Sequence, residues 1–364
     1  MSTSGATIRL LRDGEQEALV ALLDGWELPG WPGPAGAFFR RYLELDPTFA
    51  PDNVIVAEHA GRLLGCVQIF PRRLRVRRRG ARGDGLAETP MGGIGSVFTH
   101  SEARGAGLAS ALLERAAAEM RARGFELSLL FASRHAFYGR LGWHLWPRER
   151  ALWLRPEATR AAAPDPSLRI APFDPARDLA DAFALHEAYS GALEGTCVRD
   201  AAFFRAQLGF AGQPSEDFLL ARDAADGTLL AFARAAAVEG VLLVTELARR
   251  AEARAAEALA ELVLALLAPR DPDRLAVDCG RPSHELRRAL VAPCHRDREL
   301  ADALARRGAG VRSFSSRDVM VRVLDGEAFA RRTGVPRAPA ESEVAWLERA
   351  LPPDRLVLWP ADRF

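Results

Sequence analysis

The sequence predicts an α/β protein built from two similar domains in tandem, and three observations support this. Short apolar segments with strand-like spacing alternate with longer segments whose apolar residues recur at the spacing of a helix. This order of elements occurs twice, beginning at Ile8–Leu11 and again at Leu168–Ile170. The length of 364 residues also exceeds the usual size of one compact domain. We therefore expect two α/β domains followed by a tail.

The same elements follow in the same order in both halves. Two apolar strands joined by a short turn precede a third strand, which leads into a long helix rich in alanine and leucine. In the first half, the expected strands and helix are Val54–Ala57, Leu63–Phe70, Ile94–Thr99 and Leu108–Arg121. In the second half, the corresponding segments include Phe218–Ala221, Thr228–Ala233 and Ala251–Leu267. The chain thus contains an internal repeat of one structural unit.

An alanine- and proline-rich stretch, Ala158–Pro166, interrupts the apolar pattern and predicts a linker. The tail contains an amphipathic helical pattern at Glu343–Leu351 and an apolar, strand-like end at Leu356–Trp359. A tail of this length is too short for an independent core, so we expect it to pack near the functional site of the first domain. The predicted first domain, linker, second domain and tail are residues 1–157, 158–167, 168–324 and 325–364.

The charge balance excludes one class of partner. The formal net charge is +1, which gives the protein no strong basic field of the kind that nucleic-acid binding requires. The exception is a local run of arginines between two strand-like stretches. We interpret this run as a solvated strand or hairpin rather than a binding patch: Arg72, Arg73, Arg75, Arg77, Arg78, Arg79 and Arg82.

Cysteine spacing and hydropathy favour a reduced, cytoplasmic setting. The pairs Cys279 with His284 and Cys294 with His295 match no usual ligand set, so we expect no metal site. No basic segment followed by an apolar core opens the chain, and no apolar run approaches the ~20 residues that cross a bilayer. We expect a soluble protein that is not exported and has no membrane partner. Neither a disulfide framework nor a zinc site fits the four cysteines, Cys66, Cys197, Cys279 and Cys294.

The segment Arg104–Ala109 is the first candidate for a binding site. It connects a predicted strand to a predicted helix and contains Gly105 and Gly107. The first N–H groups of a helix have no intrahelical acceptor and the helix dipole is positive there, so this turn can hold a pyrophosphate. The glycines allow close approach of the backbone, and Arg104 adds a fixed positive charge. The same turn is also compatible with a connection that binds nothing.

A second motif farther along the chain distinguishes between these alternatives. A Walker loop is excluded because no Gly-Lys-Ser/Thr follows, and a dinucleotide fingerprint lacks its third glycine. Ser133–Trp143 reads Ser-Arg-His-Ala-Phe-Tyr-Gly-Arg-Leu-Gly-Trp. Together with Arg104–Ala109, it resembles the signature of the Gcn5-related N-acetyltransferase (GNAT) superfamily, Arg/Gln-x-x-Gly-x-Gly/Ala followed by Phe-Tyr-x-x-x-Gly-Phe/Trp. The resemblance implies two tandem acyl-coenzyme A N-acyltransferase folds, each a mixed, mostly antiparallel sheet flanked by helices.

The resemblance also implies roles for individual residues of the first copy. The strand before the loop would offer its backbone, at Val97 and Thr99, to the pantetheine arm of acetyl-coenzyme A (acetyl-CoA). Backbone N–H groups near Ser96 and Val97 are candidates to polarise the thioester carbonyl. Ser133 is expected near the arm and Tyr138 near the sulfur. The loop would take the pyrophosphate through Arg104, Gly105, Ala106, Gly107, Leu108 and Ala109.

The chemistry of acetyl transfer suits a tyrosine at position 138. Transfer from a thioester to an amine needs a neutral amine, a stabilised oxyanion and a proton for the departing thiolate. A tyrosine hydroxyl, with a pKa of about 10, is protonated at neutral pH and can donate that proton. The alternative is that the Tyr138 ring only packs beside Trp143 and Trp146.

The duplication is similar to that of the enhanced-intracellular-survival (Eis) type of acetyltransferase. In that family the carboxylate of the terminal residue acts as general base, and the residue here is Phe364. We therefore expect Tyr138 and Phe364 to be catalytic, with a frayed terminus as the alternative for Phe364. A sterol-carrier-like domain follows in that family, whereas a short tail follows here, and Arg363 stands where that family can carry an acidic residue. In the second copy, Leu247–Ala256 has no glycine, so we expect that copy to be degenerate and structural.

The expected acceptor region is aromatic. Trp26, Trp31 and Phe38 lie in a proline-containing segment that resembles the substrate-covering region of these enzymes, where rings can bind a cationic amine. Packing over the core is the alternative. The expected function is transfer of acetyl from acetyl-CoA to a primary amine of a small molecule or peptide in a ternary complex. A non-catalytic acyl-CoA sensor or interaction protein and a tandem aminoacyl ligase are the alternatives. The acceptor, the acyl-chain preference and the oligomeric state, a homo-oligomer included, stay open.

Overall fold

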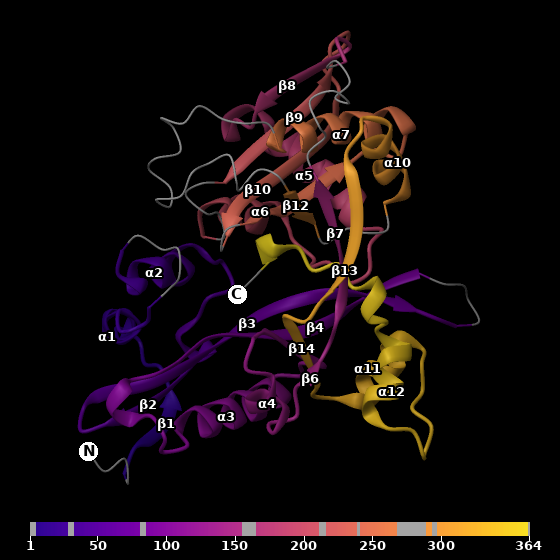
Figure 1. Cartoon of the computed structure of the whole chain (residues 1–364). Coiled ribbons are helices and arrows are strands. Elements are labelled where there is room, and N and C mark those ends of the chain that lie inside the picture. The colour runs from indigo at the N-terminus through magenta and orange to yellow at the C-terminus, as the bar shows by residue number, and fades with distance from the viewer. Residues whose placement is uncertain are drawn as a thin grey trace.

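The computed structural model describes residues 5–27, 33–80, 85–154, 165–210, 216–238, 241–267, 289–292 and 297–362. These residues form two seven-stranded sheets, which lie in the lower and upper parts of Figure 1. Apolar clusters between sheet and helices occupy both faces of each sheet. The structure therefore has the predicted class, two mixed, mostly antiparallel sheets flanked by helices.

The first sheet runs in the order β1-β2-β3-β4-β5-β14-β6. Neighbouring strands are antiparallel except β4 and β5, which are parallel. With 17 and 15 residues, β3 and β4 form a long hairpin that runs below the second half in Figure 1. The strands are Thr7–Leu10 (β1), Val54–His59 (β2), Arg62–Arg78 (β3), Gly85–Thr99 (β4), Leu127–Phe131 (β5), His144–Leu145 (β6) and Val319–Val323 (β14).

The second sheet repeats this plan in the order β8-β9-β10-β11-β12-β7-β13. Its one parallel pair is β11 with β12, which corresponds to β4 with β5. The strands are Arg148–Leu154 (β7), Leu168–Pro172 (β8), Asp217–Asp223 (β9), Leu229–Val238 (β10), Val241–Arg249 (β11), Ala289–Ala292 (β12) and Gly310–Ser316 (β13).

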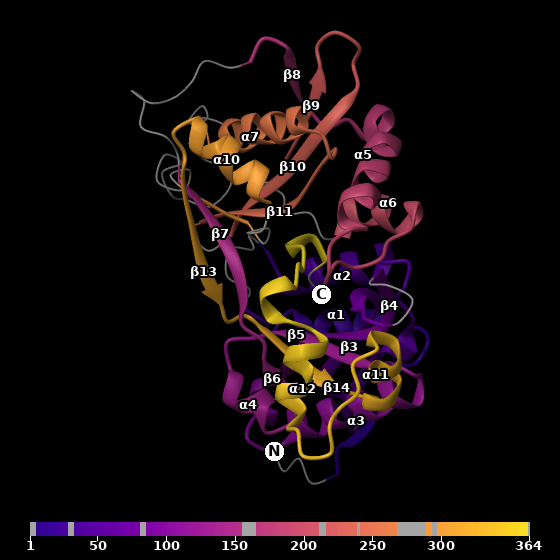
Figure 2. The ribbon, with the colours of Figure 1, turned by 90° about the vertical axis from the view of Figure 1, so that its right-hand side faces the viewer.

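One strand of each half belongs to the sheet of the other half. β7 precedes the predicted linker, yet it pairs with β12 and β13 of the second sheet. β14 comes from the predicted second domain, yet it lies between β5 and β6 of the first sheet. Each sheet thus receives an exchanged strand at the same, sixth place, and Figure 2 shows β7 and β13 running side by side between the two halves. The linker at 158–167 therefore separates the sequence repeats but not the sheets, because periodicity identifies strands and not their partners.

Helices cover both faces of the first sheet, and alternate side chains of β2 point to opposite faces. Val54 and Val56 point into the cluster under α1 and α2, whereas Ile55 and Ala57 point into the cluster under α3 and α4. No helix in the described part of the chain is long and apolar enough to cross a membrane. The described α-helices that precede the tail are Gln16–Leu23 (α1), Ala35–Leu45 (α2), Leu108–Ala122 (α3), His135–Gly139 (α4), Pro175–Ser190 (α5), Ala201–Phe210 (α6), Ala253–Leu267 (α7) and Arg298–Arg306 (α10).

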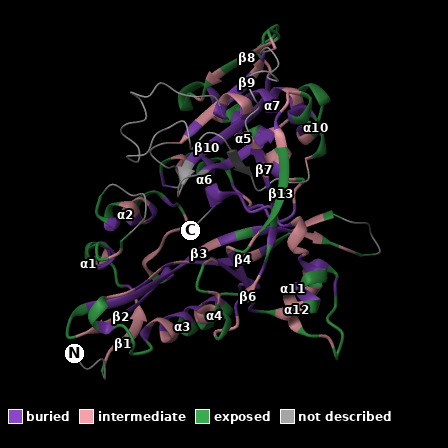
Figure 3. Ribbon diagram, in the orientation of Figure 1, coloured by how far each residue is buried: buried purple, intermediate pink, exposed green. Residues whose placement is uncertain are grey.

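The tail covers the first sheet and then passes between the halves. Helices α11 (Gly326–Thr333) and α12 (Glu343–Ala350) bury Phe329 and Trp346 in a cluster with β4, β5 and β14. The following segment, Leu356–Trp359, is buried, but the expectation of a strand there is wrong. Its alternate side chains enter the cores of different halves, so the apolar pattern reflects burial on two sides rather than sheet pairing. Figure 3 colours this segment as buried.

The arginine run on β3 is only partly solvated. Arg72 forms an ion pair of 2.6 Å with the buried Asp46, and Arg75 forms one of 2.9 Å with Glu187 of the second half. Both arginines are buried, so the interpretation of a solvated hairpin is wrong for them. The reason is that the second half covers this part of β3, where the Arg75 N–H donates to the Thr196 carbonyl at 2.9 Å. Arg82 lies outside the described residues.

Candidate functional site

The centre of the candidate site is the point where β4 and β5 separate. The two strands pair from Met91 with Leu127 to Ile94 with Leu130. Beyond Ile94, β4 continues along β3 to Thr99, whereas β5 ends soon after. The edge of residues 95–99 that faces away from β3 is therefore not covered by β5. Its N–H groups are available to an extended ligand that enters like an added strand.

A β-bulge lies within this separated part of β4. The register slips where Cys66 and Gln68 of β3 pair with Phe98 and Gly95, and Ser96 adopts a positive φ of 49°. The Cys66 thiol donates to the Ser96 carbonyl at 3.2 Å, and the Ser96 hydroxyl donates to Oε1 of Gln68, also at 3.2 Å. Burial raises the pKa of Cys66 to about 12, so the thiol keeps the proton that it donates. The bulge is thus held by two side chains of the neighbouring strand.

The loop after β4 places glycine where the backbone requires it. Gly105 and Gly107 have φ angles of 83° and 79°, and Gly107 is the N-cap of α3. A Cβ added to either would meet no atom within 4 Å, so the backbone conformation and not crowding favours glycine. In the part of the chain that the structure describes, the N–H groups of residues 105–110 have no acceptor. They form a row of free donors at the positive end of the α3 dipole.

Arg104 joins this loop to the end of β4. Its side chain is exposed, and its Nε donates to the Thr99 carbonyl at 3.2 Å. Among the described residues the guanidinium has no carboxylate partner. The terminal nitrogens are therefore free to bind an anion beside the row of N–H donors.

Tyr138 lies on α4, which follows β5. Its ring packs against Phe137 and Trp143, with centroid distances of 5.0 and 6.5 Å, and it lines the same apolar cluster as Val97 of β4. Burial raises the pKa of Tyr138, and Arg134 only partly opposes this. Within the described residues, its hydroxyl makes no hydrogen bond. Tyr138 is thus a protonated donor whose proton is not already engaged.

The two residues directly before the exchanged strand β14 support the turn that carries Tyr138. The Ala132 N–H donates to the Asp318 carbonyl at 2.9 Å, and the His135 ring bridges the carbonyls of Ala132 and Arg317 at 3.0 and 2.8 Å. Ser133 is exposed between these contacts. The Asp318 side chain pairs with two arginines of β7, and they hold its pKa below the usual range although burial opposes this. The position of α4 thus depends on a contact that local sequence patterns could not show.

The predicted acceptor residues lie on the opposite face of the sheet from α3. Trp26 stacks on Phe98 of β4 at a centroid distance of 5.8 Å and is half-buried. Phe38 lies farther from β4, packed on Phe39 and Tyr42 at 5.3 and 5.6 Å. Trp31 lies outside the described residues. Trp26 is therefore the predicted acceptor residue that the structure places directly against the separated part of β4.

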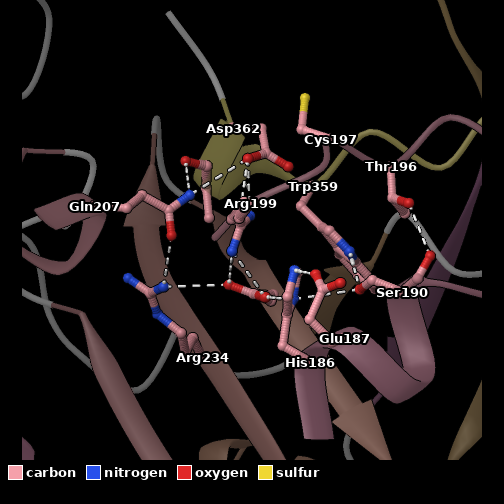
Figure 4. Close-up of polar contacts among 12 residues, drawn as sticks. His186, Glu187, Ser190, Thr196, Cys197, Arg199, Gln207, Arg234, Trp359 and Asp362 are labelled. Carbon is pink, nitrogen blue, oxygen red and sulfur yellow. Dashed lines mark hydrogen bonds and ion pairs between the residues drawn. The ribbon is translucent and has the colours of Figure 1, made fainter. Parts of the chain in front are cut away.

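Buried charges hold the end of the described tail (Figure 4). Asp362 forms an ion pair of 2.8 Å with Arg199, which is also paired with Glu246 at 3.0 Å. Gln207 donates to the Ala361 carbonyl at 2.5 Å. Phe364, the predicted base, lies outside the described residues, as do the cysteine and histidine pairs that were judged not to bind metal. Asp362 is thus an anchor near the terminus that the sequence analysis missed, because each partner comes from a distant segment.

Comparison with known proteins supports the same family. Residues 7–146 match the model of an acetyltransferase (GNAT) domain, whereas no curated protein sequence matches the chain. A probable N-acyltransferase from Enterococcus faecalis is similar in structure, with 16% identity, a TM-score of 0.63, and coverage of 90% of this chain and 75% of that one.

Two further structures are similar. Eis1 from Mycobacterium abscessus is 20% identical over 90% of this chain and 76% of that one, with a TM-score of 0.56. A tandem GNAT protein from the clavulanic acid biosynthesis pathway is 15% identical, with a TM-score of 0.51, over 88% of this chain and 99% of that one. At these identities the likeness concerns the fold, whereas the family model covers the residues of the candidate site. Residues 7–146 therefore match an acetyltransferase (GNAT) domain, and the chain as a whole shares the fold of a tandem GNAT protein.

Proposed function

We propose that the first GNAT domain transfers an acetyl group from acetyl-CoA to a primary amine of a small molecule or peptide. The observation that carries this proposal is the separation of β4 from β5 directly before the loop of free N–H donors. The uncovered edge of β4 suits the pantetheine arm, and the loop suits the pyrophosphate. Both features belong to one continuous segment, residues 95–110, so one extended ligand can use both.

The residues present fit acetyl-CoA in charge and shape. The free N–H groups of residues 105–110 and the guanidinium of Arg104 would hold the pyrophosphate. Backbone groups of Val97 and Thr99 would bond to the amides of the arm, and Ser133 would lie beside it. The N–H groups near the Ser96 bulge would face the thioester carbonyl, where negative charge develops. The bulge thus supplies donors whose direction differs from that of a regular strand.

The reaction follows from these positions. The neutral amine attacks the carbonyl carbon, a C–N bond forms, and the carbonyl oxygen becomes an oxyanion. When this intermediate collapses, the C–S bond breaks and the sulfur leaves with its electron pair. The Tyr138 hydroxyl is protonated, because burial raises its pKa. It gives its proton to that thiolate through a hydrogen bond between the two groups. The amine's proton passes to a base, for which we keep the Phe364 carboxylate as the candidate, and that proton restores Tyr138 before the next turnover.

The acceptor would approach from the face that carries α1 and α2. Trp26 lies against β4 on that face, and the cluster around it includes Phe38. These rings can contact the apolar part of an amine and stabilise its cationic form before it loses a proton. The proposed route therefore brings the thioester through the gap between β4 and β5 and the amine from the opposite side.

Release of free thiol from acetyl-CoA across a panel of primary amines tests this proposal. We expect amine-dependent release that falls by about 100-fold or more in Tyr138→Phe, since general acid catalysis contributes that much. Arg104→Glu should raise the KM for acetyl-CoA. Arg115→Glu, on an exposed position of α3, is the matched charge reversal and should leave the KM unchanged. Binding of acetyl-CoA without thiol release for any amine would refute the enzyme and favour the sensor alternative.

A further inference from the structure

A cavity lies where the two halves and the tail meet, away from the site of the first domain. It has a volume of about 410 Å³, within the range of small-molecule sites. Arg77 from β3 of the first sheet, Arg249 from β11 of the second sheet and Arg355 from the tail all line it. Arg77 is eleven residues along β3 from Cys66 at the bulge of the first site, which corresponds to about 36 Å of strand.

The cavity occupies the place in the second copy that corresponds to the first candidate site. β11 and β12 pair only at Leu242 and Leu243, after which β11 continues along β10 without β12, as β4 continues along β3 without β5. The register of β11 also slips, at Thr245, as that of β4 does at Ser96. The cavity is lined by the last residue of β11 and by the first residues of α10, the counterpart of α4.

The second copy has lost the means to bind a coenzyme A pyrophosphate there. The segment between β11 and α7, residues 250–252, contains no glycine, and Arg249 at its start is already neutralised. Arg249 pairs with Asp297 at 2.8 Å and with Glu299 at 2.9 Å. Asp297 also accepts the N–H of Leu300 and so caps α10. This site therefore needs a different ligand from that of the first copy.

Besides Arg249 and its two carboxylate partners, the charged residues that line the cavity are Arg77, Arg298, Arg355 and Glu194. Arg298 and Arg355 form no ion pair in the part of the chain that the structure describes, and Arg77 lies 3.8 Å from Glu194. The side chain of Glu194 is only 3% exposed, and its Oε2 has no hydrogen-bond partner. Burial raises the pKa of Glu194, and the nearby Arg77 and Arg355 oppose this shift.

The rest of the wall is apolar. Ala192, Leu193 and Val357 line the cavity together with the ring of Tyr189, whose hydroxyl is bonded to Asp297 at 2.9 Å. A hydrated ion such as phosphate would make no apolar contact with this wall, and a neutral apolar molecule would leave the arginines without an anionic partner. The lining matches a molecule that has an anionic group at one end and an apolar body.

We propose that this cavity of the second copy is a binding site for a small organic carboxylate with an apolar body. The carboxylate would bind between Arg355 and Arg298, while the apolar body would lie against Leu193 and Val357. Because the first sheet, the second sheet and the tail each contribute residues, the bound molecule stabilises their junction. The proposal does not depend on acyl transfer in the first domain.

Titration calorimetry and thermal unfolding of the full chain with naphthoate test this site. The neutral naphthamide has the same body without the charge, and acetate has the charge without the body. We expect naphthoate to bind, to raise Tm, and to bind at least tenfold more tightly than either of the other two. Arg355→Met and Arg298→Gln should each weaken naphthoate binding about tenfold or more. Arg331→Gln, which changes an exposed arginine of α11, is the control and should bind as the unmodified chain does.

Two results would overturn the proposal. One is the absence of naphthoate binding at millimolar concentration to the unmodified chain. The other is binding that naphthamide equals, or that Arg298→Gln leaves unchanged. Arg298 is exposed at the first turn of α10, so Arg298→Gln remains informative if Arg355→Met fails to fold. Acetyl-CoA binding, measured on the same samples, should be unaffected by naphthoate, which separates this site from the first one.

Discussion

Replacing Arg199 with methionine should destabilise the protein strongly, because Arg199 connects two buried carboxylates. Arg199 and Glu246 have fully buried side chains, and that of Asp362 is 3% exposed. Removal of one partner from a buried ion pair costs about 3–5 kcal/mol. Glu246 would keep its ion pairs with His186 and Arg234. The expected loss therefore comes from Asp362 and lies at the lower end of this range, about 3 kcal/mol.

The second step of this experiment is a double-mutant cycle. Asp362→Asn in the Arg199→Met background removes the charge that was left unpaired, so it should recover part of the lost stability. Urea denaturation measures the free energy of unfolding of each variant, and Tm should fall by about 6 °C in Arg199→Met at roughly 2 °C per kcal/mol. A loss below about 1 kcal/mol, or effects that simply add, would refute the reasoning, because the pair would then contribute no more than an exposed one.

Three further changes test other parts of the structure. Hydrogen bonds from Arg177, Arg222 and the backbone lower the pKa of Asp178 from 3.8 to about 2. The Asp178 carboxylate therefore contributes its full stabilisation above the unfolded pKa, and this contribution is lost as pH falls toward 2. Asp178→Asn should therefore lower the free energy of unfolding at neutral pH and reduce its fall between pH of about 4 and 2. An unchanged dependence on pH in urea titrations would contradict this. His135→Leu leaves the Ala132 carbonyl without its hydrogen bond and should lower the free energy of unfolding by about 1–2 kcal/mol. We also expect a lower kcat, because α4 shifts. A thermal scan and thiol-release kinetics measure these two effects, and unchanged values would argue against the support of α4 by the residues before β14. One residue added after Phe364 should reduce turnover if its carboxylate is the base, and unchanged turnover would remove Phe364 from the mechanism.

The first candidate site could be predicted from sequence because its signals are local. Gly105 and Gly107 need a positive φ at the start of a helix, and that requirement depends on a few neighbouring residues. The same holds for the turn that carries Tyr138. A motif of this kind keeps its meaning without knowledge of what packs around it, and the alternation of strands and helices predicted the fold class for the same reason.

The features that the sequence did not predict depend on contacts between distant segments. Sequence periodicity identified the strands on either side of the linker but could not show that β7 and β14 change sheets. Cys66 and Gln68 support the bulge from β3, and no local pattern distinguishes them from ordinary strand residues. The arginines of β3 looked solvated because their partners, Asp46 and Glu187, come from α2's end and from the second half.

The central claim, that the loop before α3 binds acetyl-CoA, is tested most directly by a matched pair of glycine substitutions. Gly107 and Gly124 lie at the two ends of α3 with φ angles of 79° and 77°, and neither has an atom within 4 Å of an added Cβ. Alanine at either position should therefore cost the same stability, about 1 kcal/mol. Titration calorimetry with acetyl-CoA should show a Kd at least tenfold weaker for Gly107→Ala and unchanged for Gly124→Ala. Equal affinities for the two variants would contradict the assignment of the site.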